Sequence, residues 1–215
     1  MTRKLLNRGM TTTDLTAKPA PYHHGDLRNV LIKTGREMLE ADGLRGFSLR
    51  ALARNAQVSH AAPVHHFKTL DAFYADCRTD GFRELSDALE TAKATASGPP
   101  VQVLTRMAMA YLDFGNRCPV MLRMMFDKDT APPRTDDPDS QSRRAYLLLE
   151  NAVGETLSGA PHDPRLFDIR INAVWSLIHG FVILQNEDQI CRRSDPPIST
   201  EDMLARSLAA MLRNG

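Results

Sequence analysis

The chain has 215 residues, of which 42% are hydrophobic and 25% are charged, and its formal net charge at pH 7 is +1. This composition is that of an ordinary soluble globular protein of one or two domains. The three cysteines, Cys77, Cys118 and Cys191, are widely spaced, which argues against a disulfide framework and a zinc site. Residues 1–21 contain no apolar run of signal-sequence length, and no later segment is expected to reach the ~20 apolar residues that cross a bilayer. We therefore expect a cytoplasmic protein without a membrane partner.

The small net charge is unevenly distributed along the chain. Residues 1–68 hold 11 of the 27 Lys and Arg residues and 5 of the 26 Asp and Glu residues, a net charge of +6, so the remainder carries −5. Five of the seven histidines lie in the same basic part: His23, His24, His60, His65 and His66. This asymmetry predicts a domain that faces a polyanion, although a solvated basic face has the same charge.

The N-terminal part is predicted to hold a tail followed by helices. Residues 1–22 mix Thr, Lys, Pro and Arg without periodicity, which is typical of a mobile tail. A helical pattern begins at Asp26, and Gly43 follows it as a C-cap. One stripe of this helix is expected to be apolar: Leu27, Val30, Leu31, Met38 and Ala41. Ser48 is the predicted N-cap of the next helix, and a long helix is expected from about Leu70 into the 90s.

The part of the chain after Pro99 is also predicted to be helical. Helices are expected over 100–116, from Pro119 onward for two turns, and over about 140–157, 164–189 and 200–212. The acidic, proline-rich residues 127–138 are expected to be a linker. Because no segment shows strand alternation, we predict an all-α chain of about nine helices in two or more layers.

The segment from Ser48 to Thr69 has the sequence SLRALARNAQVSHAAPVHHFKT. It predicts two short helices joined by a tight turn, and the second, with Pro63 inside it, is too short to be stable alone. Two such helices are typical of a helix-turn-helix, whose second helix enters the DNA major groove. Ser59 is the predicted N-cap of that helix, which would point the positive end of its dipole toward phosphate.

The stretch GLRGFSLRALARNAQVSHAAPVHHFKTLDAFYADC closely resembles the DNA-binding domain of the TetR-type repressor family. The resemblance covers residues 24–78 and rests on four features: Gly43…Phe47-Ser48, Leu52-Ala53, Val58-Ser59 and His66-Phe67. Two further stretches, WSLIHGFVIL and YLDFGNRCPVMLRMMF, resemble the Trp-x-x-x-His-Gly segment of one ligand-domain subgroup and the helix pair before it. The resemblance implies a homodimer, an effector pocket in the C-terminal helices, and release of DNA when the effector binds.

Three positions depart from the pattern of the family. Gln57 stands where a turn glycine is usual, which costs on the order of 1 kcal/mol if its φ is positive. Val64 stands where a tyrosine commonly contacts phosphate, and Leu70 stands where a lysine commonly does so. Two phosphate contacts are therefore expected to be lost, and Lys68 with the basic tail could compensate for them.

The resemblance implies a set of DNA-binding residues: Ser48, Arg50, Ser59, His60, Ala61, Val64, His65, His66, Lys68 and Thr69. Ser48 and Arg50 would contact phosphates, and His60 is the expected base reader because Ala61 offers only a methyl contact. His65, His66, Lys68 and Thr69 would hold the DNA backbone and fix the register. Alternatively, His66 packs and caps without touching DNA. No metal site is expected at the two adjacent histidines, because neighbours on a helix point about 100° apart.

Five of the ten methionines lie between Met107 and Met125, where they could form an adaptable wall for an apolar ligand together with Phe126. The expected ligand-binding residues are Met107, Tyr111, Phe114, Met121, Met125, Trp175 and His179. Plain core packing is the alternative for the methionines and aromatic residues. A satisfied core histidine is the alternative for His179. No cofactor and no metal are expected.

The helix over 164–189 is apolar nearly all round its central part, so one face must pack outside its own domain. A second copy of the chain is the expected partner, with the helix over 200–212 adding Leu204, Leu208 and Met211 on one stripe. Two helices from each subunit would form a four-helix interface, and its two-fold symmetry would match a palindromic operator in double-stranded DNA.

These observations predict a TetR-like dimeric transcriptional repressor that a small, largely apolar effector releases from DNA. The expected division is a tail over 1–22, a helix-turn-helix domain over 23–69, and a ligand-binding and dimerisation domain over 70–215. The alternative is a helical ligand-binding or adaptor protein without specific DNA recognition. An enzyme using Cys118 with His179 is a third hypothesis, and no catalytic motif supports it.

Overall fold

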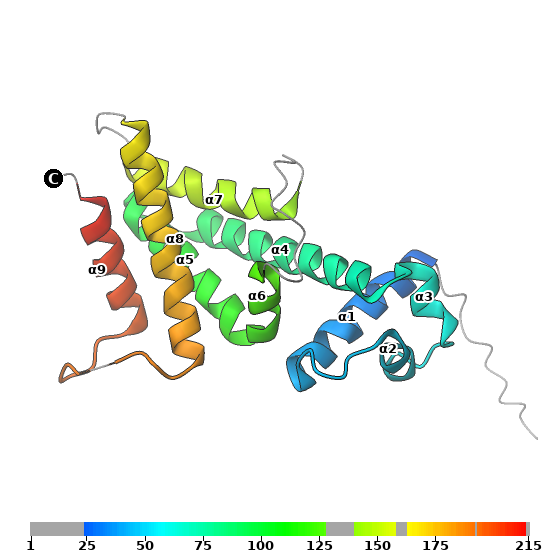
Figure 1. Cartoon of the computed structure of the whole chain (residues 1–215). Helices are drawn as coiled ribbons and strands as arrows, with labels where there is room; N and C mark the ends of the chain where they lie inside the picture. The colour runs from blue at the N-terminus through cyan, green and yellow to red at the C-terminus, as the bar shows by residue number, and fades with distance from the viewer. Residues whose placement is uncertain (1–23, 128–139, 158–162, 192, 214–215) are drawn as a thin grey trace, which may run out of the picture.

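The computed structural model describes residues 24–127, 140–157, 163–191 and 193–213. Within these ranges the chain forms nine α-helices and no strand, which confirms the all-α prediction (Figure 1). The helices are α1 (His24–Asp42), α2 (Leu49–Asn55), α3 (Ala61–Phe67), α4 (Leu70–Thr95), α5 (Pro100–Arg117), α6 (Pro119–Phe126), α7 (Gln141–Thr156), α8 (Pro164–Asn186) and α9 (Thr200–Leu212). The predicted tail over 1–22 and residues 128–138 of the predicted linker lie outside the described residues.

The helices form a small unit and a larger bundle that α4 connects. Helices α1, α2 and α3 lie together at one end of the molecule, and α4 runs from them into the bundle (Figure 1). There α4 packs against α5, α6 and α7, while α8 and α9 pack against each other and against α5. The end formed by α2 and α3 therefore lies far from α9, and α4 and α6 lie between the two regions.

Local chemistry explains most helix boundaries. The Ser48 hydroxyl accepts a hydrogen bond from the Ala51 N–H at 3.1 Å, which confirms Ser48 as the N-cap of α2. Gly43, with φ 72°, ends α1, and its N–H donates to the Leu39 carbonyl at 2.9 Å. Proline stands at the start of α5, α6 and α8, where its missing N–H removes no helical hydrogen bond.

The predicted N-cap of α3 is wrong. The helix begins at Ala61, the residue before it is His60, and no side chain caps it. An N-cap residue needs an extended backbone for its side chain to reach the first N–H groups, whereas His60 has helical angles, φ −58° and ψ −24°. Ser59 contributes its backbone carbonyl instead, which accepts from the Ala62 N–H at 3.0 Å.

The core of the small unit is centred on Phe73 of α4. The Phe73 ring stacks on Phe47 at 5.2 Å and meets Phe67 edge-on at 5.1 Å between ring centroids. A Cβ on Gly35 would lie 2.2 Å from the Phe73 ring, so only glycine allows α1 to approach this closely. The predicted stripe of α1 is confirmed in part, because Leu31 is buried and Leu27 and Met38 pack against the core. Ala41 is exposed instead, and the face also includes the buried Ile32, Gly35 and Leu39.

Helix α8 is long and apolar enough to cross a membrane by length and composition, so the expectation that no segment reaches that size is wrong. Asn172, Ser176 and His179 interrupt the apolar run of α8 in the sequence. The mean hydropathy of the helix nevertheless remains high enough for a membrane-spanning segment. In the structure α8 packs against α5, α7 and α9, which makes it part of the bundle. Only 22% of its most apolar window is buried within the chain. Its exposed apolar side chains are those of Leu166, Ile169 and Leu184.

Candidate DNA-binding surface and ligand cavity

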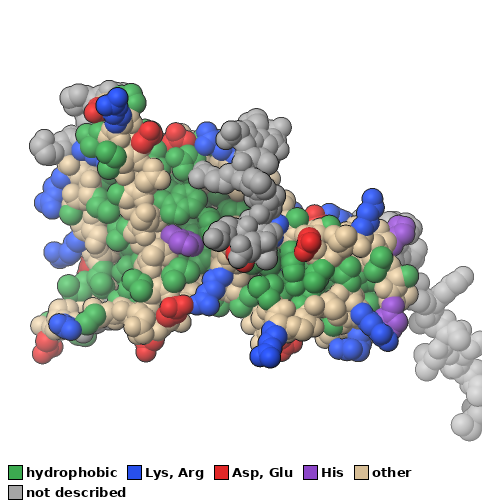
Figure 2. Space-filling model, viewed as in Figure 1, with side chains coloured by type: hydrophobic (Ala, Val, Ile, Leu, Met, Phe, Trp, Pro, Cys, Tyr) green, Lys and Arg blue, Asp and Glu red, His purple; other side chains and the backbone are tan. Residues whose placement is uncertain are grey.

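Nine of the ten predicted DNA-binding residues have exposed side chains, and His66 is half-buried. Because residues i and i+4 share a helix face, Pro63 and Phe67 together turn one side of α3 inward, where both are buried. Val64, at 50% exposure, and His65 lie on the other side. Figure 2 shows Lys, Arg and His side chains gathered at the end of the molecule formed by α2 and α3. Helix α3 thus presents a continuous outer face.

Aromatic packing and a cation–π contact hold α3 against the rest of the small unit. Phe67 is 3% exposed, its ring packs on Phe73, and the guanidinium of Arg28 lies 5.6 Å from its centroid. Arg28 also pairs with Asp76 of α4. These contacts explain how a seven-residue helix with an internal proline is held in one orientation.

Two exposed residues with positive φ lie on either side of α3. Gln57 has φ 56°, so the replacement of the usual turn glycine does place a side chain in the left-handed region, at a cost of about 1 kcal/mol. Lys68 has φ 63°, and its N–H donates to the Val64 carbonyl at 2.9 Å, which ends α3. Lys68 therefore lies at the junction of α3 and α4 in a positive-φ conformation. The sequence pattern did not indicate this conformation.

The hydroxyl groups of Ser48 and Thr69 already accept hydrogen bonds from helix N–H groups. Thr69 caps α4, where its Oγ1 accepts from the Ala72 N–H at 3.1 Å. A hydroxyl that accepts in this way still has its own O–H to donate. Both exposed residues can therefore cap a helix and donate to a phosphate oxygen at the same time.

A partly open cavity of about 40 Å³ lies in the bundle, lined by residues of helices α4 to α8. Four predicted ligand-binding residues line it: Met107, Tyr111, Trp175 and His179. The other lining residues are Phe82, Leu85, Leu89, Leu104, Ala108, Phe126, Ala145, Leu149 and Ile178. The cavity thus draws on five helices that are spread over almost a hundred residues of sequence.

The structure does not place Phe114, Met121 and Met125 at the cavity. All three are buried elsewhere in the core. Met121 and Met125 pack over Gly81 of α4, where a Cβ would lie 2.8 Å from the Met125 sulfur. The next residue, Phe126, points about 100° further round the helix and faces the cavity instead.

Sequence reasoning missed the contribution of α4 to the cavity. Phe82, Leu85 and Leu89 have the i, i+3, i+7 spacing of one helix face, and this signal is visible in the sequence. The spacing indicates a buried face without distinguishing a cavity wall from ordinary core, because that depends on what the neighbouring helices leave unfilled.

One polar pair interrupts the apolar wall of the cavity. The Tyr111 hydroxyl and the His179 Nδ1 are 2.8 Å apart, which joins α5 to α8. Burial lowers the pKa of His179 and raises the pKa of Tyr111, so the pair is uncharged near neutral pH. The Phe126 ring lies 4.7 Å from the imidazole, edge to face. His179 is therefore a hydrogen-bonded histidine that also lines the cavity.

The other reactive side chains show no catalytic arrangement among the described residues. Cys118 is half-buried, and burial raises the pKa of its thiol, which disfavours the nucleophilic thiolate. Within the same residues no group of three or more His, Cys, Asp or Glu side chains is placed to hold a metal ion. The rings of His65 and His66 are 5.6 Å apart and nearly perpendicular.

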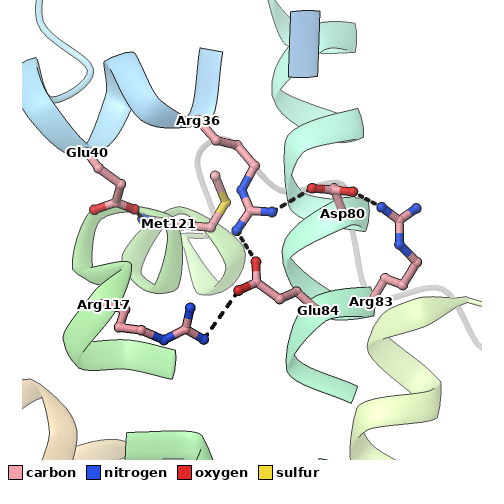
Figure 3. Close-up of polar contacts among 7 residues, drawn as sticks. All are labelled: Arg36, Glu40, Asp80, Arg83, Glu84, Arg117 and Met121. Atoms are coloured by element: carbon pink, nitrogen blue, oxygen red, sulfur yellow. Dashed lines mark hydrogen bonds and ion pairs between the residues drawn. The ribbon is translucent and has the colours of Figure 1, made fainter. Parts of the chain in front are cut away.

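A charged network joins the small unit to the bundle (Figure 3). Arg36 of α1 donates to Asp80 at 2.5 Å and to Glu84 at 2.6 Å, both on α4. Burial lowers the pKa of Arg36, but hydrogen bonds and the charges of Glu84 and Asp80 outweigh it and raise that pKa overall. Arg83 pairs with Asp80, and Arg117 of α5 reaches Glu84 at 3.3 Å. The network therefore connects α1, α4 and α5.

Glu40 of α1 caps the N-terminus of α6. Its carboxylate accepts from the N–H groups of Val120 at 3.1 Å and Met121 at 2.7 Å. A carboxylate at this position satisfies two otherwise unpaired donors and opposes the positive end of the helix dipole. Because Phe126 at the other end of α6 lines the cavity, one short helix connects α1 to the cavity wall.

The chain combines a helix-turn-helix unit, whose second helix is exposed, with a helical bundle that contains an apolar cavity. This combination defines a class of DNA-binding regulators. Residues 104–211, half of the chain, match the family model described as Tetracyclin repressor-like, C-terminal domain. The chain therefore belongs to the TetR family and is a TetR-like transcriptional regulator.

Other proteins are similar to this chain over most of its length and of their own. A Bacillus subtilis (strain 168) protein, described as the uncharacterized HTH-type transcriptional regulator YobS, is 24% identical over 88% of this chain and 95% of its own. The solved structure of a Rhodococcus sp. RHA1 protein of unknown function is 29% identical, with a TM-score of 0.72 over 89% of this chain and 96% of its own. A TetR-like transcriptional regulator from the same organism is 14% identical, with a TM-score of 0.58 over 86% and 92%. The last similarity supports the fold alone.

Proposed function

We propose that this regulator is a homodimeric repressor that binds a palindromic operator through α3 and releases it when a small, largely apolar effector enters the cavity. The exposed outer face of α3 carries the proposal, because its buried anchors leave the predicted DNA-binding residues free of the core. Residues 23–69 would form the DNA-binding domain and residues 70–215 the ligand-binding and dimerisation domain, with 1–22 as a tail. Such a regulator would act in the cytoplasm, where it meets the chromosome.

In this proposal the contacts divide into base and phosphate contacts. His60 would read a base edge, with Ala61 and Val64 offering apolar contact to thymine methyl groups. Two exposed groups flank the helix and would contact phosphates: Ser48, Arg50 and Ser59 before it, and His65, Lys68 and Thr69 at its end. His66, which is half-buried, would support this end of the helix and contact the backbone with its exposed part.

The proposed dimer interface is formed by α8 and α9. Exposed apolar residues are concentrated here, with Ile169 at 64%, Leu184 at 46% and Met211 at 38% exposure. Among the described residues outside its own stretch of helix, no atom lies within 4 Å of a Cβ added to Gly180, which leaves room for a close helix from a second copy. Leu204 and Leu208 are fully buried within the chain, so α9 would use its other face. Two-fold symmetry would then present two α3 helices to successive major grooves.

The Trp-x-x-x-His-Gly segment supports assignment to the subgroup that carries it, because Trp175 and His179 both line the cavity. An effector that favours one position of Phe126 would shift α6 and, through Glu40, the end of α1. Such a ligand changes the spacing of the two α3 helices only if it binds one spacing more tightly than the other. The effector then increases the population of dimers whose α3 spacing does not fit the operator, and DNA is released.

Binding to DNA from upstream of its own gene, titrated at several salt concentrations against scrambled DNA, tests the proposal. We expect tight, palindrome-dependent binding by a dimer, with an affinity that falls as salt rises. Binding that depends on salt alone and ignores sequence would overturn the proposal and favour a helical ligand-binding protein.

Two matched variants separate the dimer from the DNA contact. Ile169→Glu places a charge in the proposed interface and should give a folded monomer in sedimentation, with loss of palindrome-dependent binding. Val64→Glu places the same charge on another exposed apolar residue, at 50% exposure, and should remain dimeric while losing DNA. A dimer in both variants would move the interface away from α8.

A further inference from the structure

We propose that the cavity binds an uncharged ligand with one aromatic ring and one hydroxyl group, held by Tyr111 and His179. This proposal rests on the proposed function in taking the cavity as the effector site, and it names the chemistry of the effector.

The composition of the cavity wall excludes a charged ligand. None of its thirteen lining residues is Asp, Glu, Lys or Arg. A carboxylate or ammonium group would therefore lose its hydration without gaining a partner of opposite charge, which is strongly unfavourable. The pair formed by Tyr111 and His179 is also uncharged near neutral pH, because burial disfavours the ionised form of each. The wall therefore favours a neutral ligand over a charged one.

The wall is unusually rich in aromatic residues. Four of the thirteen lining residues are Phe, Tyr or Trp, whereas these make up 6% of the chain. Phe126 is central to them: its ring lies 5.5 Å from Phe82 and 5.6 Å from Trp175, nearly perpendicular to both. Rings arranged edge to face leave further ring faces and edges on which the ring of a ligand can pack. An aromatic ligand extends this arrangement better than an aliphatic one.

The polar pair selects a hydroxyl group. If Tyr111 donates to Nδ1 of His179, the imidazole keeps its Nε2–H as a donor and the phenol oxygen keeps a free lone pair. If Nδ1–H donates instead, the phenol O–H is free and Nε2 becomes an acceptor. Either tautomer leaves one donor and one acceptor. A hydroxyl group both donates and accepts, so it can satisfy either arrangement, whereas a purely apolar ligand would satisfy neither.

The small empty volume of the cavity favours a ligand with a single ring over a larger one. Its volume of about 40 Å³ is well below the roughly 150 Å³ of an engineered apolar cavity that binds benzene. A ring can enter only if a wall side chain moves, and Met107, with its flexible thioether chain, is suited to do so.

Trp175 provides a direct probe, because it is the single tryptophan of the chain and it lines the cavity. The full-length protein would be titrated near neutral pH, without DNA, with four compounds of similar size: benzyl alcohol, toluene, cyclohexylmethanol and benzoate. Trp175 fluorescence, excited where these compounds do not absorb, reports occupancy, and a thermal unfolding midpoint measured in parallel reports binding independently.

We expect benzyl alcohol to bind at least about tenfold more tightly than benzoate and more tightly than cyclohexylmethanol. Tyr111→Phe should weaken benzyl alcohol by about five- to tenfold and leave toluene within about twofold, because only the alcohol loses a hydrogen bond. Tyr146→Phe is the matched control: Tyr146 contacts Trp175 with rings 5.8 Å apart but does not line the cavity, so both affinities should stay unchanged.

Three results would overturn the proposal: benzoate or cyclohexylmethanol binding as tightly as benzyl alcohol, equal losses for benzyl alcohol and toluene in Tyr111→Phe, or no response to any compound. The assay contains no DNA, so its outcome is separate from that of the operator experiment. Specific operator binding without any ligand response would remove this proposal and keep the DNA-binding one. A benzyl alcohol response in a protein that does not bind its operator specifically would keep this proposal and remove the DNA-binding one.

Discussion

The outer face of α3 lies outside the core of the molecule, whereas the wall of the cavity is part of the core. On α3, Val64 and His65 are exposed while Pro63 and Phe67 provide the packing. In the cavity, Met107 is 2% exposed and belongs to the core that it helps to line. Substitutions at the first surface can therefore change binding without changing stability, whereas substitutions in the second change both.

The largest expected difference lies within α3, between its buried side and its exposed side. Phe67→Ala should lower the free energy of unfolding by about 3–5 kcal/mol, because it removes the aromatic anchor that packs on Phe73. Val64→Ala, three residues away on the exposed side, should change it by less than about 0.5 kcal/mol. Urea denaturation measures both. Similar losses for the two variants would mean that the faces of α3 are not divided as described.

The network between the two regions should have the next largest effect. Arg36→Gln removes the half-buried guanidinium that bridges Asp80 and Glu84 and leaves them only the exposed cations Arg83 and Arg117, which should cost about 2 kcal/mol of unfolding free energy. The control is Arg106→Gln, since the pair of Arg106 with Glu201 is exposed and should be worth less than about 1 kcal/mol. Equal effects in thermal or urea unfolding would contradict a structural role for the network.

The DNA-contacting surface itself should divide into two kinds of residue. His60→Ala should cost about 1–3 kcal/mol of binding to the operator and relax the preference over scrambled DNA. Lys68→Ala should weaken both DNAs alike and reduce the salt slope by about 1. Fluorescence anisotropy at several salt concentrations measures these quantities. Parallel losses in the two variants, on both DNAs, would contradict the division.

A small stabilising change is expected at the turn before α3. Gln57→Gly should raise the free energy of unfolding by about 1 kcal/mol, because glycine adopts φ 56° without steric cost. Arg54→Gly, an exposed helical position in α2, should lower it by about the same amount. Urea midpoints compare the two, and a loss of stability in Gln57→Gly would show that the turn is not strained.

The weakest expected effect is the pH dependence of the cavity. Burial lowers the pKa of His179 in the folded chain, so the unfolded chain binds this proton first as the pH falls. Stability should therefore decrease as the pH drops below about 6.5, the ordinary histidine pKa, and be unaffected by this group above it. His179→Gln should lose less stability than the wild type between pH 7 and the lower pKa. An identical pH profile of the thermal midpoint in the two proteins would assign the acid sensitivity to other groups.

Helix boundaries and the helix-turn-helix were predictable because their causes are local. The Ser48 cap, the Gly43 end of α1 and the prolines of α5, α6 and α8 all act within a few residues of sequence. The error at Ser59 has the same origin, because a good capping residue acts only when its backbone is extended. Here the chain is already helical at His60.

The residues that line the cavity were only partly predictable, because the lining depends on how the helices are rotated against each other. Met107 and Met125 look alike in the sequence, yet one lines the cavity and the other packs over Gly81. The helices, the helix-turn-helix and an apolar bundle could be predicted from the residues alone, since periodicity and capping are local properties. The contact of Tyr111 with His179 and the cap that Glu40 provides to a helix 80 residues later could not, because such contacts exist only once distant helices pack together.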